Sequence, residues 1–156
     1  MLKSLINYQT KPNQTMPNSI VTQDLLNSYS AAEYHVDAVP PFILKIGIFS
    51  HELMRLYEST NSNCAAFITA YNPGSNELPT DVNVVRNQEL EMLISSMRYP
   101  FVRGTGKCAD DDGLGEVSLL IVGMDKITAI DVGKKFEQNA IVWCAGDATP
   151  QLILLK

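Results

Sequence analysis

The sequence lacks the features that would place it in a membrane. No stretch approaches the ~20 consecutive apolar residues that a membrane-spanning helix needs, and residues 1–6 lack the apolar run of a signal peptide. We therefore expect no membrane association, and a cytoplasmic location is the default expectation.

Cysteine is scarce as well. The chain has 3 cysteines, Cys64, Cys108 and Cys144, and no two of them stand at a short metal-binding spacing. Cys64 and Cys144 lie in apolar runs, where a free thiol behaves as a small hydrophobic side chain. An odd number of separated thiols suits a reducing compartment and argues against a disulfide scaffold.

Positive charge is sparse. The 12 Lys and Arg residues are outnumbered by 17 Asp and Glu residues, which gives a formal net charge of −5. An acidic chain repels the phosphate backbone, so we expect no non-specific nucleic-acid binding. The same charge can steer the chain toward basic protein partners.

A phosphate-binding loop is missing, although one segment resembles it. The run Gly104-Thr105-Gly106-Lys107 has Phe101 where the first glycine of that motif belongs, and Cys108 where Ser or Thr must follow the lysine. The sequence therefore predicts a glycine turn between two strands at this place.

Metal and nucleophile motifs are incomplete too. His51-Glu52 begins like a zinc-protease helix, but Arg55 stands where the second histidine is required. Asp110-Asp111-Asp112-Gly113 lacks the alternating ligand spacing of a calcium loop, which favours a solvated turn. No Gly-x-Ser-x-Gly elbow occurs. We predict no metal and no cofactor.

What is present fits one globular domain. The chain has 156 residues, of which 46% are hydrophobic, enough to bury a core. Residues 1–20 contain prolines and many amides, and we predict a flexible extension there, followed by a single α/β domain over residues 21–156.

Alternating helix and strand signals fill the domain. Thr22, Ser50 and Asp125 are placed to cap helices, and the apolar run from Cys64 to Tyr71 predicts a central strand. The resulting fold class is α/β (α+β), with a mixed β-sheet of about five to six strands and helices packed against it. The remaining predicted elements are strands near 42–47, 99–103, 116–122, 140–144 and 151–154, and a helix over 82–97 that buries Val84, Val85, Leu90, Leu93, Ile94 and Met97.

Polar residues gather at the ends of these elements. Binding sites in open α/β sheets favour the carboxyl ends of strands, and helix N-termini offer free N–H groups to anions. A lone carboxylate on an apolar strand, as at Glu116, needs a partner, for which Arg86 is a candidate. Glu116 is the candidate catalytic acid or base. The candidate ligand-binding residues are Thr69, Asn72, Asn83, Arg86, Asn87, Gly104, Gly106, Ser118, Gln138 and Asn139. Each also has an ordinary structural explanation as a turn, cap or salt bridge.

These residues recur in a known pattern. Over residues 42–154 the sequence resembles a bacterial family of domains of unknown function, number 3293. The resemblance is carried by Phe67-Ile68-Thr69-Ala70-Tyr71-Asn72-Pro73, Asn83 with Arg86-Asn87, Gly104-Thr105-Gly106, Glu116-x-Ser118 and Phe136-Glu137-Gln138-Asn139-Ala140-Ile141. One departure is Gly113-Leu114-Gly115, which stands where the family carries an aromatic residue. The resemblance implies no activity.

Three functions are compatible with the sequence. The first is a site, binding or enzymatic, for a small polar or anionic ligand. The alternative is an acidic protein-interaction module that acts as an inhibitor or accessory factor, for instance in conflict between bacteria and phage or plasmids. The third is a homodimer formed through a sheet edge at Gln151–Lys156.

Overall fold

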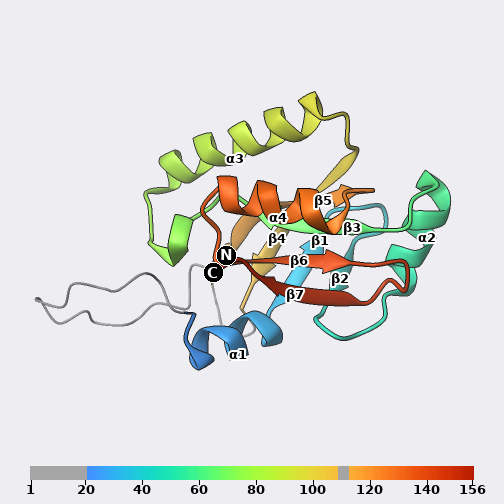
Figure 1. Ribbon diagram of the computed structural model, residues 1–156, viewed down its shortest axis with the longest axis horizontal. Helices are drawn as coiled ribbons and strands as arrows, with labels where there is room; N and C mark the ends of the chain where they lie inside the picture. The colour runs from blue at the N-terminus through green and yellow to red at the C-terminus, as the bar shows by residue number, and fades with distance from the viewer. Residues whose placement is uncertain (1–20, 109–112) are drawn as a thin grey trace, which may run out of the picture.

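A computed structural model describes residues 21–108 and 113–156. The expected extension at 1–20 and the aspartates of the 110–112 turn lie outside the described residues. The described chain contains four α-helices, one short 3-10 helix and seven strands (Figure 1). In chain order they are α1 (Gln23–Ala31), β1 (Glu33–Val36), β2 (Phe42–Leu44), α2 (His51–Thr60), β3 (Ala65–Thr69), η2 (Pro73–Ser75), α3 (Thr80–Ser96), β4 (Phe101–Lys107), β5 (Glu116–Val122), α4 (Lys126–Lys135), β6 (Ala140–Cys144) and β7 (Pro150–Leu154).

Three helices begin at the predicted caps. The side chains of Thr22, Ser50 and Asp125 each accept a hydrogen bond from the backbone N–H three residues later. This contact satisfies one of the N–H groups that a helix start leaves unpaired. α2 ends at Asn61, whose left-handed backbone (φ 51°) closes the helix.

The strands form one sheet in the order β2-β1-β4-β5-β3-β6-β7, and every described pair is antiparallel. The expectation of a mixed sheet with five to six strands was therefore wrong in strand direction and in number. The additional strand is β1 (Glu33–Val36), in a segment for which the sequence predicted no strand. Pairing with β2 and β4 on either side makes this short segment extended.

The sheet is covered on both faces. β3 lies between β5 and β6 and is buried along its whole length, which confirms the predicted central strand. Alternation along β3 directs Ala65 and Phe67 into a core shared with α1 and α2 residues, and Ala66 and Ile68 into a second core under α3 and α4. Figure 1 shows α3 and α4 on the same side of the sheet, with α3 at the periphery.

The predicted glycine turn is wrong, because Gly104 and Gly106 lie within β4. Gly104 stands opposite Val36 on one side and Ser118 on the other. A Cβ at Gly104 would overlap the carbonyl oxygen of His35 and lie 2.9 Å from the Phe67 ring. The glycine is therefore needed for close approach within the sheet, not for a turn.

α3 packs on a different side than its sequence suggests. Leu90 and Ile94 are buried as expected, but Val84 and Val85 are exposed, while Asn83 and Asn87 are buried in their place. Met97, also expected in the core, is 38% exposed. Among the described residues, no helix is long and apolar enough to cross a membrane.

Candidate functional site

The candidate residues meet at one end of the sheet. Because β3 runs antiparallel to both neighbours, its carboxyl end lies beside the amino ends of β5 and β6. Thr69 stands opposite Ser118, and in the next pair of strands Gly104 and Gly106 stand opposite Ser118 and Glu116. The rule for carboxyl ends of parallel strands does not apply to this sheet, and antiparallel pairing brings the residues together instead.

Asn72, Asn83 and Glu116 form the centre of the cluster. Asn72 Nδ2 donates to Glu116 Oε1 at 2.8 Å, and Asn83 Nδ2 donates to Asn72 Oδ1 at 2.8 Å. The Asn72 backbone N–H donates to Asn83 Oδ1 at 2.9 Å, so the two asparagines are joined twice. Asn72 Oδ1 also accepts from the Leu78 N–H at 3.0 Å. These bonds tie β3, the following loop, α3 and β5 together.

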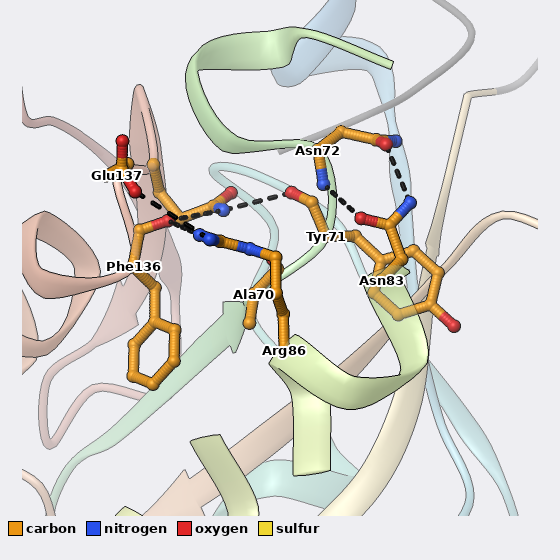
Figure 2. Close-up of polar contacts among 8 residues, drawn as sticks. Ala70, Tyr71, Asn72, Asn83, Arg86, Phe136 and Glu137 are labelled. Atoms are coloured by element: carbon orange, nitrogen blue, oxygen red, sulfur yellow. Dashed lines mark hydrogen bonds and ion pairs between the residues drawn. The ribbon is translucent and has the colours of Figure 1, made fainter. Parts of the chain in front are cut away.

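Arg86 does not contact Glu116 as the sequence suggested. Its Nε donates to the Ala70 carbonyl at 2.9 Å and its Nη2 to the Phe136 carbonyl at 3.0 Å. Its Nη1 lies 3.7 Å from Glu137 Oε1, in an ion pair whose carboxylate is mostly exposed. Figure 2 shows Arg86 reaching from α3 across Ala70 to the loop after α4. Arg86 thus joins α3 to two other segments of backbone.

Three further candidate residues form hydrogen bonds with backbone groups at strand ends. Asn87 Oδ1 accepts from the Ala70 N–H at 3.3 Å. Thr69 Oγ1 donates to the Val117 carbonyl at 2.6 Å and accepts from the next loop, while Ser118 Oγ donates to the Glu116 carbonyl at 2.9 Å. Each contact satisfies a backbone group that the sheet leaves unpaired.

Gln138 and Asn139 complete the cluster from the loop between α4 and β6. Gln138 Nε2 donates to the Tyr71 carbonyl at 3.0 Å, and Asn139 Nδ2 donates to Ser75 Oγ at 2.9 Å. Ser75 Oγ is also 2.9 Å from the Tyr29 hydroxyl. Sequence reasoning missed Ser75 and Tyr29, because a serine in a turn and a tyrosine on a helix face give no signal of their own.

The cluster is closed to solvent. The eight candidates Thr69, Asn72, Asn83, Asn87, Glu116, Ser118, Gln138 and Asn139 are all at most 4% exposed. Two shallow surface hollows of the described chain, one along α3 and one beside β1 and β2, are lined by none of these residues. Most of the polar groups satisfy one another, as a structural network does.

Two buried carbonyl oxygens are exceptions. Among the described residues, Gln138 Oε1 and Asn139 Oδ1 have no hydrogen-bond donor, although both residues are at least 98% buried. The backbone is also strained close by, since Asn72, Ser75 and Glu137 all have positive φ (46°, 62° and 58°). Such strain persists only where surrounding contacts hold it, and it is concentrated at functional sites.

Two tyrosines near the cluster, Tyr29 and Tyr34, and two cysteines at the opposite end of β3, Cys64 and Cys144, stay neutral. Burial raises the pKa of Tyr29, an effect that its hydrogen bond with Ser75 partly opposes, and burial also raises the pKa of Tyr34. Burial raises the pKa of the Cys64 thiol, and that of Cys144 to about 12. Because each raised pKa lies farther above physiological pH, all four groups keep their protons there, and none of them supplies a base or a thiolate.

Fold and site together define a small α/β domain in which a buried polar network fastens two loops and α3 to one end of an antiparallel sheet. Residues 68–141, which contain nearly all of that network, match the model of the family described as "Protein of unknown function (DUF3293)". This match supports membership of the family and confirms the resemblance over residues 68–141. Searches of curated proteins and of solved structures gave no match.

Proposed function

We propose that this domain is a protein-interaction module and that the outward side of α3 is its contact surface. The observation that carries the proposal is the exposure of four large apolar side chains on this helix. Val82, Val84, Val85 and Met92 are 41%, 39%, 53% and 72% exposed. By helical spacing, Val85 and Met92 lie opposite the buried Leu90 and Ile94, and Val82 and Val84 lie on the two flanks. Large apolar side chains left exposed on one element of a small domain favour an interaction site.

The buried network supports this proposal because it fixes which side of α3 faces out. Asn83, Arg86 and Asn87 are turned toward the sheet and engage its loops. If α3 only covered the sheet, burying its valines would stabilise the fold more than burying asparagines. Departures from that rule are expected where a surface serves a function.

Site-specific cross-linking tests the proposal. A photo-reactive residue at Gln88, which lies on the outward side of α3, should give a discrete protein adduct in an extract of the source cells. The same residue at Glu58, exposed on α2, should not. Val85→Thr/Met92→Gln keeps side-chain size while removing apolar surface, and should suppress the adduct. Equal labelling from both positions would refute the proposal.

A second candidate function, a site for a small polar ligand, is favoured by the two unpaired carbonyl oxygens. A buried acceptor without a donor costs about 1–3 kcal/mol, so a ligand with N–H or O–H groups would relieve it at Gln138 and Asn139. Arg86 already donates to two carbonyl oxygens, and this favours a neutral or cationic ligand over an anion. We therefore expect such a ligand to raise the melting temperature in a thermal-shift screen of metabolites, nucleotides and metals, and to lose this effect in Glu116→Gln.

Other expectations stay predictions. They are a role in conflict between bacteria and phage or plasmids, a cytoplasmic location, the lack of non-specific nucleic-acid binding, and a homodimer through the edge at Gln151–Lys156. β7 is an edge strand of the sheet, as that homodimer requires. Light scattering after size exclusion would show whether it forms.

A further inference from the structure

We infer that the partner of α3 is a basic amphipathic helix, with apolar side chains seven residues apart and Lys or Arg beside them. The inference rests on the proposed function and adds the chemistry of the partner. It is carried by the spacing of the exposed apolar side chains, by a hollow next to them and by the charges on the same side.

The apolar side chains repeat at a helical spacing. Val85 and Met92 are seven residues, or about 10.5 Å, apart along α3 and lie opposite its buried Leu90 and Ile94. Val82 lies one turn before Val85, on one flank of this side. Side chains spaced by seven residues on a second helix match this repeat, as in helix pairs that pack along an apolar seam.

A shallow hollow adjoins this stripe. It is lined by Gln88, Glu91, Met92 and Ser95, all on α3. Its wall is partly the flexible Met92 side chain, which adapts to different apolar shapes. An apolar side chain from a partner helix can be received there, next to Met92.

The charged residues that α3 itself presents on this side are acidic. Asp81 and Glu89 are exposed, and Arg86, the only Lys or Arg between residues 80 and 97, is turned inward onto backbone carbonyls. Glu91 is held by Arg103, which donates to it at 2.8 and 2.9 Å. Acidic groups that flank an apolar stripe favour a partner with basic groups in the matching positions.

A second copy of this chain is a poorer occupant. Antiparallel pairing of two α3 helices about a two-fold axis would place Val85 against Met92 of the copy, with the axis midway between them. Glu89 would then lie close to the same residue of the copy. Like charges opposed at the centre of an interface disfavour association, whereas a lysine or arginine of another protein would match them.

Two synthetic helical peptides test the inference. Both carry leucine every seven residues, one with lysine and the other with glutamate at the flanking positions. Fluorescence anisotropy with the full chain at low salt should show binding of the lysine peptide, and binding of the glutamate peptide weaker by about tenfold. The difference should shrink at 0.5 M salt, since exposed charges are screened there.

Matched variants locate the contact. Glu89→Lys should lower the affinity for the lysine peptide by about fivefold and raise the affinity for the glutamate peptide. Glu58→Lys on α2 makes the same change in net charge and should leave both affinities unchanged. Val85→Thr/Met92→Gln should abolish binding, and Ile48→Thr, at an exposed apolar residue outside α3, should not.

The outcomes separate this inference from the proposed function. Equal binding of both peptides, lost in Val85→Thr/Met92→Gln, would overturn the basic partner and leave α3 as the contact surface. No peptide binding, together with an adduct from Gln88, would also overturn this inference alone. No peptide binding and no adduct would overturn both.

Discussion

Replacement of Asn72 by aspartate isolates one bond of the buried network. Aspartate has nearly the same shape, tolerates the left-handed backbone of this position, and keeps the oxygen that accepts from Asn83 and Leu78. The only loss is the Nδ2 group that donates to Glu116 Oε1 at 2.8 Å. In its place, a carboxylate oxygen faces another carboxylate in a buried site.

The destabilisation follows from that geometry. Two buried carboxylates at this distance cannot both stay ionised, so the folded variant must take up a proton or tolerate the repulsion. Loss of a hydrogen bond to a buried charged group costs about 3 kcal/mol before the repulsion is added, which for a chain of this length lowers the melting temperature by roughly 10 °C. Because the unfolded chain holds fewer protons than the folded variant, stability should fall further as the pH rises from 5 to 8.

The assay is urea denaturation at pH 5 and pH 8. It compares the wild type with Asn72→Asp and with Asn72→Asp/Glu116→Gln. The double variant restores a donor–acceptor pair with reversed direction and should recover at least half of the lost stability. Asn76→Asp, the same change at an exposed position nearby, serves as the control. If Asn72→Asp at pH 8 stays within about 0.5 kcal/mol of the control, the buried bond does not hold this end of the sheet.

Four shorter predictions address other parts of the fold. Gly104→Ala should lower the free energy of unfolding, measured by urea denaturation, by about 1–3 kcal/mol, because the new Cβ would overlap the backbone of β1. An unchanged urea midpoint would contradict this. Ser75→Ala should lower the free energy of unfolding by about 2 kcal/mol in the same assay, since it removes the buried hydroxyl that contacts both the Tyr29 hydroxyl and the Asn139 amide. The pKa of Glu91 is lowered by hydrogen bonds from Arg103, so the stability that this pair adds should be present above pH 4.5 and lost as the pH falls below it; Arg103→Gln should differ from the wild type at pH 7 but not at pH 3. Cys144, whose pKa is raised to about 12 by burial, should resist alkylation at pH 8 until the chain is denatured, as mass spectrometry can show.

The sequence by itself determined the local elements. Thr22, Ser50 and Asp125 cap helices as predicted, and the apolar run of β3 forms the central strand. These signals depend on a few neighbouring residues, so they can be interpreted without the fold. Most of the candidate site residues do lie together at one end of the sheet, but their role in binding a ligand stays a prediction.

Tertiary structure decided how these elements and side chains pair. β1 is a strand because it pairs with β2 and β4 on either side. Gly104 is required because a Cβ there would overlap the backbone of β1. Glu116 is paired with Asn72 and not with Arg86, since antiparallel strands bring the end of β3 beside the start of β5.

The orientation of α3 depends most clearly on the tertiary structure. Its sequence supports two possible buried sides, one with Val85 and one with Asn83. The hydrogen bonds that Asn83 and Asn87 make with the end of β3 exist only once that strand and its loop are in place. The periodicity of apolar residues predicts only which side of a helix gains most from hydrophobic burial. In α3 the hydrogen bonds to a distant segment determine the buried side instead, and they leave apolar side chains facing solvent.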